Sequence, residues 1–288
     1  MKEDVPHDQL PDSPFPGIDP FGYKDRNVFF ARTAETEALV RLVVLYRGVL
    51  LYSDSGTGKS SLINAGVIPR ALEEGYHVER IRVQPRTGEE IVIQRSEKVG
   101  NETISYQSIF TSDEGPERVV LPVEEFLGKL RQHAGDTRTL LIFDQFEEWV
   151  TLFEEATGSN AADAAKESQE NIRNAICSLI NDAKLPVKVV LALREDYLAK
   201  LTPFFQLCPN LPDQYLRLVA LKGEQIYQAI RGPFEKYPGR FRREISPALA
   251  RTIQTDFEGR NAGADIRLTE VQIVSLLSKL AEDPAQRC

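Results

Sequence analysis

The chain has few of the side chains that build metal sites and disulfide frameworks. Its 288 residues include only three cysteines and three histidines. The cysteines, Cys177, Cys208 and Cys288, form no CxxC pair, which excludes a paired-cysteine zinc motif and favours a reducing compartment. The histidines lie far apart in the sequence, so neither a histidine metal site nor a histidine-based catalytic triad is supported.

An excess of basic charge and a long hydrophobic run are also missing. Lys and Arg number 35 against 43 Asp and Glu, a formal net charge of −8. This balance argues against nucleic acid or an anionic membrane as a partner, because both need a basic face. The longest apolar region is interrupted by Arg41 and Arg47 and is too short to cross a bilayer. The acidic, polar N-terminus has no signal-peptide pattern, so we expect a cytoplasmic protein.

The most informative stretch present is Ser53–Ser61, which reads SDSGTGKSS. It follows an apolar run that predicts a buried strand and precedes a predicted helix, which is the context of a phosphate-binding loop. Gly56 and Gly58 allow consecutive backbone N–H groups to surround a polyphosphate. Lys59 is expected at the β- and γ-phosphates, and the Ser60 hydroxyl at Mg²⁺. The loop residues expected to bind nucleotide are Asp54, Ser55, Gly56, Thr57, Gly58, Lys59, Ser60 and Ser61.

A second apolar run, Leu140–Phe143, is followed by Asp144 and predicts a Walker B strand whose aspartate reaches the Mg²⁺ shell. Gln145 stands where the simplest AAA-type pattern has a catalytic glutamate, and an amide cannot act as a base. Glu147 or Glu148 could orient and deprotonate a water molecule. Alternatively, both are ordinary first-turn acids that complement a helix dipole.

A third apolar run, 187–193, ends in Arg194 and predicts a strand between the other two. At the carboxyl end of such a strand, a guanidinium would point at the γ-phosphate and sense or stabilise transferred charge. The alternative is a surface arginine that caps the strand.

The alternation of strands and helices predicts an α/β fold of the P-loop NTPase type: three α/β/α layers around a five-stranded parallel sheet of order 5-1-4-3-2. We expect residues 1–14 to form a mobile arm and residues 15–236 the NTPase core, with a β-hairpin inserted at about 89–111. Residues 237–288 predict a small all-helical subdomain. The five strands are expected near residues 49–52, 78–83, 139–143, 187–193 and 215–221.

With these elements in place, the sequence resembles the STAND class of P-loop NTPases, and within it the bacterial novel STAND NTPases. The resemblance covers residues 15 to about 280 and rests on the motifs FPGIDPF, FFAR, SDSGTGKSSLINAGVIP, LLIFDQFEE and VVLALRED. It implies that Lys59 and Ser60 bind phosphate and Mg²⁺, and that Asp144 binds the metal. The acidic pair and Arg194 then match the family's catalytic acids and sensor arginine. The resemblance also implies that Phe30 and Arg32 help to hold the adenine side of ATP or ADP.

The resemblance implies a switch. ADP holds such proteins as closed monomers, and ATP with a trigger favours an open homo-oligomer with slow hydrolysis, often in bacterial signalling or anti-phage defence. Family members carry effector and sensor domains that we do not find here, so we expect a module truncated before a winged-helix unit, or one whose partners are separate chains. No sequence pattern identifies the trigger, the effector output or the oligomer size.

Three departures from the family pattern leave alternatives open. Ser53 replaces the first loop glycine, Ala31 replaces the glycine usual before Arg32, and Ala220 stands where a proline often contacts the base. The chain could therefore be a degenerate scaffold that holds nucleotide without turnover. A P-loop small-molecule kinase is a third reading, but it would need an arginine-rich lid and an acceptor pocket.

Overall fold

The computed structural model describes residues 10–83, 90–94, 98–99, 102–103, 109–110, 118–133, 137–154, 159–242, 244–260 and 270–275. Contacts divide the chain into two compact units. The first comprises residues 1–37, 55–69 and 218–288, and the second comprises residues 38–54 and 70–217. The chain therefore passes four times from one unit to the other.

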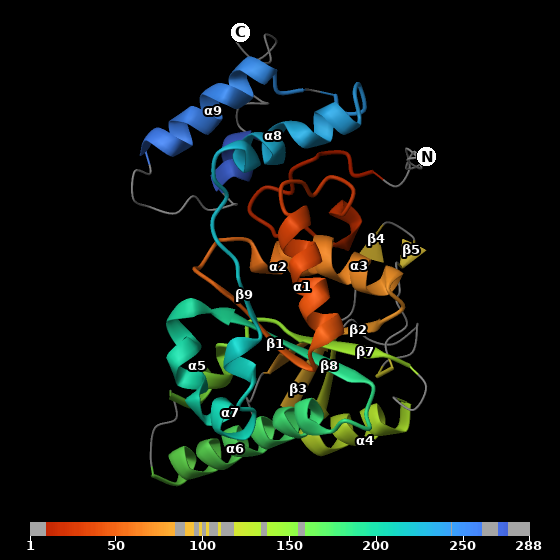
Figure 1. The fold of residues 1–288 in the computed structure, drawn as a ribbon, viewed down its shortest axis with the longest axis vertical. Helices are drawn as coiled ribbons and strands as arrows, with labels where there is room; N and C mark the ends of the chain where they lie inside the picture. The colour runs from red at the N-terminus through yellow and green to blue at the C-terminus, as the bar shows by residue number, and fades with distance from the viewer. Residues whose placement is uncertain are drawn as a thin grey trace. The chain divides into compact units, whose positions relative to one another are not determined.

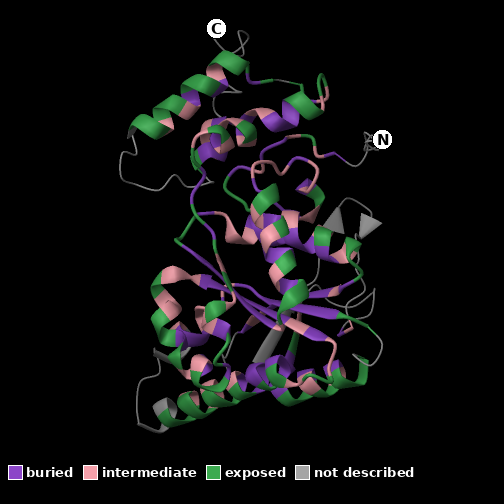
Figure 2. Cartoon of the chain, viewed as in Figure 1, coloured by how far each residue is buried: buried purple, intermediate pink, exposed green. Residues whose placement is uncertain are grey.

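The second unit is built on a seven-stranded sheet (Figure 1). In spatial order its strands are β6 (Arg118–Pro122), β3 (Glu90–Gln94), β2 (His77–Val83), β7 (Thr139–Phe143), β8 (Val187–Arg194), β1 (Gly48–Ser53) and β9 (Tyr215–Arg217). Neighbouring strands pair in parallel along the series β2, β7, β8, β1 and β9. This confirms the predicted order of the five parallel strands. β1 and β7 are buried along their whole length (Figure 2), which explains their almost unbroken apolar sequences.

The sheet has two strands more than predicted. β3 and β6 extend it beyond β2, and both pairings are antiparallel. β4 (Lys98–Val99) and β5 (Glu102–Thr103) form a separate two-stranded ladder. Two residues of the expected hairpin, Ile104 and Tyr106, lie outside the described residues.

Helices on both faces of the sheet complete the α/β layers (Figure 1). On one face lie α4 (Val123–His133), α6 (Ser159–Asn181) and α7 (Thr202–Leu207), with α5 (Glu148–Glu154) between β7 and α6 in the chain. Short 3-10 turns, η4 (Glu195–Leu201) and η5 (Leu211–Asp213), flank α7. An aromatic cluster anchors these helices: the ring centroids of Trp149 and Phe204 lie 4.8 Å apart, and Phe146 stacks on Trp149 at 5.9 Å.

The first unit is mainly helical. It holds η2 (Tyr23–Asp25), α2 (Lys59–Ser61), the π-helical turn η3 (Leu62–Val67), α8 (Glu224–Lys236) and α9 (Pro247–Arg260). Helices α1 (Thr33–Leu45) and α3 (Ile68–Glu73) run on into the second unit. The core of the first unit includes a group of aromatic rings: Phe234 packs edge-on against Phe15 and Phe241, with centroids 6.1 and 5.7 Å apart.

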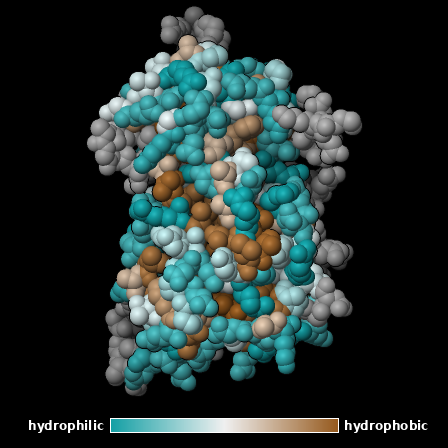
Figure 3. Space-filling model, viewed as in Figure 1, coloured by the Kyte–Doolittle hydropathy of each residue, from teal (hydrophilic) through white to brown (hydrophobic). Residues whose placement is uncertain are grey.

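An apolar area of the surface lies where α1 ends. Val44 and Leu45 are 48% and 70% exposed, and Figure 3 shows apolar surface over this part of the helix. None of the described helices is both long and apolar enough to cross a membrane.

Candidate functional site

The glycine-rich loop joins β1 to α2. Gly56 and Gly58 have φ of 79° and 100°, a left-handed conformation that glycine adopts without the strain of a side chain. Gly58 precedes α2, and no side chain caps that helix start. Residues 54–56 are exposed and residues 58–60 are partly buried. This backbone fits a bound polyphosphate, because N–H groups at such a turn and helix start attract anions.

The hydroxyl groups of the loop have different surroundings. The Ser61 side chain is buried, and its oxygen accepts the backbone N–H of Phe21 at 3.1 Å. Thr57 is 4% exposed, whereas Ser60 is only partly buried. Ser60 is therefore the hydroxyl that fits the predicted metal-ligand role, while the Ser61 side chain fastens the N-terminal segment.

Arg32 is buried and bonds to three separate segments. Its guanidinium forms an ion pair with Glu35 at 2.7 Å. It also donates to the backbone carbonyls of Thr57, at 3.2 Å, and Val219, at 2.8 Å. Burial lowers the pKa of Arg32, and the hydrogen bond that Arg32 donates to Glu35 opposes that effect. Arg32 thus fixes the glycine-rich loop by its hydrogen bond to the backbone carbonyl of Thr57.

Phe30 and Ala31 precede this arginine and shape the same segment. Phe30 packs against α8, where a Cβ added to Gly232 would lie 2.5 Å from the ring. Ala31 has φ of 68°, a conformation that favours glycine, the residue that the resemblance implies at this position. Ser53, by contrast, is an extended residue at the end of β1 and pairs with Arg194, so glycine is not required there.

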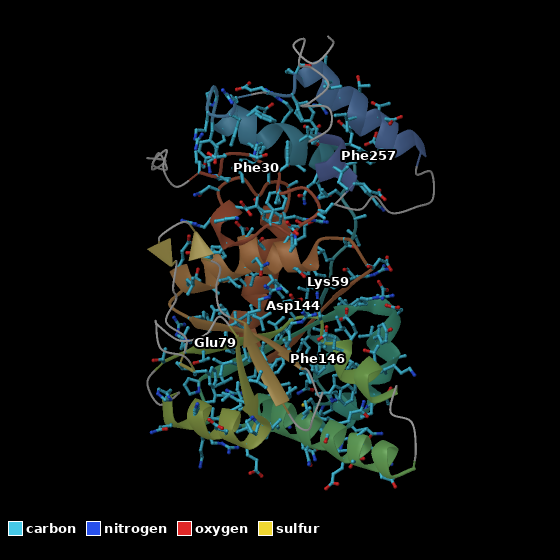
Figure 4. All side chains as sticks on the ribbon, turned by 180° about the vertical axis from the view of Figure 1, so that it is seen from behind. Phe30, Lys59, Glu79, Asp144, Phe146 and Phe257 are labelled. Carbon is cyan, nitrogen blue, oxygen red and sulfur yellow. The ribbon has the colours of Figure 1, made fainter. Side chains whose placement is uncertain are left out.

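Asp144 follows β7 and is almost completely buried (Figure 4). Its Oδ2 accepts hydrogen bonds from Arg80 of β2, at 2.6 Å from Nη2 and 3.2 Å from Nε. Its Oδ1 accepts the backbone N–H of Gln145 at 2.9 Å. Gln145 has φ of 56°, a strained conformation for a residue with a side chain. The turn thereby points Phe146 into the core and leads the chain into α5.

The acidic pair stands at the start of α5, where Glu148 is the first helical residue. Glu147 Oε2 accepts the backbone N–H of Arg194 at 3.3 Å. Glu148 forms an ion pair with Arg82 of β2. Burial raises the pKa of Glu148, and the positive charge of Arg82 opposes that rise. The two acids therefore differ in their environment.

Arg194 lies at the carboxyl end of β8, in register with Ser53 of β1. Its side chain is 42% exposed and forms an ion pair with Asp196 at 2.6 Å. The guanidinium also lies 5.4 Å from the ring centroid of Tyr197. The hydrogen bond to Asp196 raises the pKa of Arg194. β8 lies between β1 and β7, as predicted, and the guanidinium at its end is bonded to Asp196, two residues further along the chain.

Sequence reasoning missed Arg80 and Arg82, whose side chains form ion pairs with Asp144 and Glu148. The available signal was their spacing, because residues two apart on a strand share one face. Within the described residues, no three His, Cys, Asp or Glu side chains gather as a metal site.

A parallel sheet of this order, with a glycine-rich loop after β1 and an aspartate after β7, defines a P-loop NTPase. The sequence matches the family described as Novel STAND NTPase 1 over residues 14–264, and the chain belongs to that family. It is therefore a nucleotide-binding P-loop NTPase. No curated protein sequence matches it.

Solved structures of low sequence identity share the fold. One is Hsp104 of S. cerevisiae in its extended casein complex, with a TM-score of 0.50 and 16% identity over 88% of this chain. Another is a Walker-type ATPase of Pyrococcus abyssi, with a TM-score of 0.51 and 13% identity over 92% of this chain. The chain spans 38% of the Hsp104 chain and 71% of the Pyrococcus chain. At these identities the likeness shows the fold alone.

Proposed function

We propose that this chain is an ATP-binding switch module that hydrolyses ATP slowly. The observation that carries the proposal is the left-handed glycine loop after β1, in a sheet where β7 ends in the buried Asp144. In this proposal Lys59 binds the β- and γ-phosphates, and the loop N–H groups surround them. Ser60 and Asp144 hold Mg²⁺. The bound Mg²⁺ would supply charge neutralisation of the phosphates.

The other site residues position the loop or act on the γ-phosphate. Arg32 holds the loop through the Thr57 carbonyl, and Phe30 lies in the segment proposed to border the adenine. Arg194 would exchange its ion pair with Asp196 for the γ-phosphate, because an exposed pair contributes little stability. Such an exchange would make the end of β8 sensitive to whether ATP or ADP is bound.

The switch function follows from that sensitivity and from the family. We propose that ADP holds a monomer and that ATP favours a homo-oligomer, with effector and sensor functions in other domains or chains. Bacterial signalling or anti-phage defence in the cytoplasm is the setting that fits such a module.

A degenerate scaffold without turnover is the second candidate. The contacts of Asp144 favour it, because Arg80 and the Gln145 N–H already occupy both carboxylate oxygens. A carboxylate can accept several hydrogen bonds, however, so these contacts leave metal binding possible.

One experiment separates the two candidates. The purified protein is denatured, the released nucleotide is identified, and ATP turnover is compared between wild type and the double variant Glu147→Gln/Glu148→Gln. Retained ADP with slow turnover that the variant loses supports the switch. Tightly held nucleotide without turnover in either protein supports the scaffold.

Lys59→Ala tests the binding site itself. Loss of the ammonium group should abolish nucleotide binding, measured by calorimetry with ATP and ADP, since no other loop side chain offers a cation. The matched control is Lys184→Ala, an exposed lysine beyond α6 that should leave affinity unchanged. Unchanged affinity in Lys59→Ala would refute the site assignment.

A further inference from the structure

Two buried thiols are in contact between helices α6 and α7, which pack against each other (Figure 1). Cys177 lies on α6, and Cys208 directly follows α7. Asn181, one helical turn after Cys177, donates its side-chain N–H to the carbonyl of Leu207 at 3.0 Å. This bond holds the end of α7 against the face of α6 that carries Cys177. The Cys177 thiol donates a hydrogen bond to the sulfur of Cys208.

Cys208 also lines a cavity of about 250 Å³ between the ends of α1 and α6 and the turn after α7. Only 3% of Cys208 is exposed, but Leu45, Asn181 and Pro209 line the same cavity and are exposed. The cavity therefore lies at the surface of the second unit. Among the described residues that line it, Cys177 does not appear. A small molecule in the cavity would thus reach Cys208 before Cys177.

The contact between the two thiols makes them chemically unequal. The hydrogen bond from Cys177 lowers the pKa of the Cys208 thiol, burial opposes that effect, and a hydrogen bond with Asn181 supports it. The same contact raises the pKa of Cys177, and burial raises it further. Because the thiolate is the nucleophilic form of cysteine, Cys208 is the thiol of this pair that reacts first.

We propose that Cys177 and Cys208 form a reversible redox site that small hydroperoxides oxidise to a disulfide. This inference does not depend on the ATP-binding function proposed above. The disulfide would link α6 to the end of α7. In a reducing compartment such a bond is transient and serves redox sensing or catalysis.

The oxidation proceeds in two steps. The Cys208 sulfur attacks one peroxide oxygen and the O–O bond breaks. The leaving hydroxide takes the electron pair and the proton that Cys208 released, so water forms and Cys208 becomes a sulfenic acid. The Cys177 sulfur then attacks the Cys208 sulfur and the S–O bond breaks. The oxygen leaves as a second water with the thiol proton of Cys177, so two thiols and one peroxide yield one disulfide and two waters.

The test treats the folded full chain with hydrogen peroxide and maps its thiols and disulfides by peptide mass spectrometry. Wild type should lose two thiols and form the Cys177–Cys208 link, and dithiothreitol should restore both thiols. Cys208→Ala should slow oxidation of Cys177 at least about tenfold, because the more reactive thiol is gone. Cys177→Ala should stop at the Cys208 sulfenic acid, which dimedone traps. The matched control is Cys288→Ala, which removes the third cysteine and should leave the link unchanged.

A purely structural role as small apolar core residues would give a different result. Thiol loss that occurs only after urea unfolds the chain would overturn the proposal, because the cavity would then give peroxide no access. A dominant disulfide to Cys288, or equally fast oxidation of Cys177 with and without Cys208, would overturn it as well. If an alanine variant fails to fold, the disulfide map of wild type with and without urea decides the question.

Discussion

At the scale of single residues, two strained backbone positions border the candidate site. Among the described residues, Ala31 and Gln145 are the non-glycine positions with positive φ, at 68° and 56°. This conformation costs a residue with a side chain roughly 1–2 kcal/mol and persists where its surroundings impose it. Ala31 directly precedes Arg32, and Gln145 directly follows Asp144. The strain thus lies beside Arg32, which bonds to the glycine-rich loop, and beside Asp144, the acid proposed to hold the metal.

Ala31→Gly tests that strain. Glycine relieves the left-handed penalty but loses more chain entropy on folding, so unfolding should cost about 0.5–1 kcal/mol more than in wild type. Urea denaturation measures the change. The matched control is Ala34→Gly in the first turn of α1, where glycine should instead lower stability by up to about 1 kcal/mol. A loss in Ala31→Gly as large as in the control would show that position 31 carries no strain.

Several site residues could be predicted because each ends a long apolar run. Asp144 follows β7, Arg194 ends β8, and Lys59 lies in the loop after β1; the sequences of these strands reveal burial on both faces. Arg80 and Arg82 could not be assigned, because in HVERIRV they read as the polar face of a half-buried strand. Their contacts with acids more than sixty positions away depend on the pairing of β2 with β7, and no local pattern encodes that pairing.

At the scale of elements, the parallel strands were predictable and the antiparallel extension was not. β3 and β6 are short strands with the sequences EIVIQ and RVVLP, so the sequence is equally compatible with a separate hairpin. β3 pairs with the edge of β2 that β7 leaves open, and β6 then pairs with β3. An open sheet edge attracts any strand nearby in the chain.

The helix after the loop also departs from a regular pattern. Pro69 has no N–H, so it cannot donate to the carbonyl of Ala65. The chain widens into the π-turn η3 just before it, where Ile68 N–H donates to the Ile63 carbonyl five residues back. Gly66 in this turn approaches Thr36 of α1, and a Cβ there would lie 2.4 Å from the hydroxyl oxygen. The π-turn therefore accommodates Pro69, and the close approach of Thr36 requires a glycine at position 66.

Helix α8 offers a test of packing against the Phe30 segment. Gly232→Ala would place a Cβ 2.5 Å from the Phe30 ring, so we expect a loss of about 1–3 kcal/mol from overpacking. The matched control is Gly128→Ala on α4, where a Cβ meets nothing within 4 Å. There alanine should stabilise the helix by up to about 1 kcal/mol. Chemical denaturation of both variants checks the opposite signs, and two changes of the same sign would contradict the packing argument.

At the scale of the whole molecule, the contact-based units are discontinuous in sequence. The loop residues 55–69 are grouped with the N-terminal segment and with residues 218–288, although strands flank them in the chain. Sequence reasoning divides a chain by composition along its length, so it can propose only continuous domains. Packing instead gathers segments such as Phe15 and Phe234, whose contact spans most of the chain.

The proposed switch makes its clearest prediction in the assembly state. A nucleotide can shift an equilibrium only by its difference in affinity for the two states, so ATP and ADP must give different masses if they control assembly. Light scattering should find the 32.4 kDa monomer with ADP and a larger species with a slowly hydrolysed ATP analogue. The double variant Glu147→Gln/Glu148→Gln should remain in the larger species with ATP itself, because it cannot return to the ADP state.

Lys59→Ala serves as the control. Because this variant should not bind nucleotide, it should keep one mass with ADP, with the ATP analogue and with ATP. Wild type should dissociate as ATP is consumed, which links the assembly state to hydrolysis. If wild type binds both nucleotides yet keeps one mass at every concentration tested, the nucleotide does not control assembly. The scaffold function would then be favoured, because such a chain would hold ATP without converting its binding energy into a change of partner.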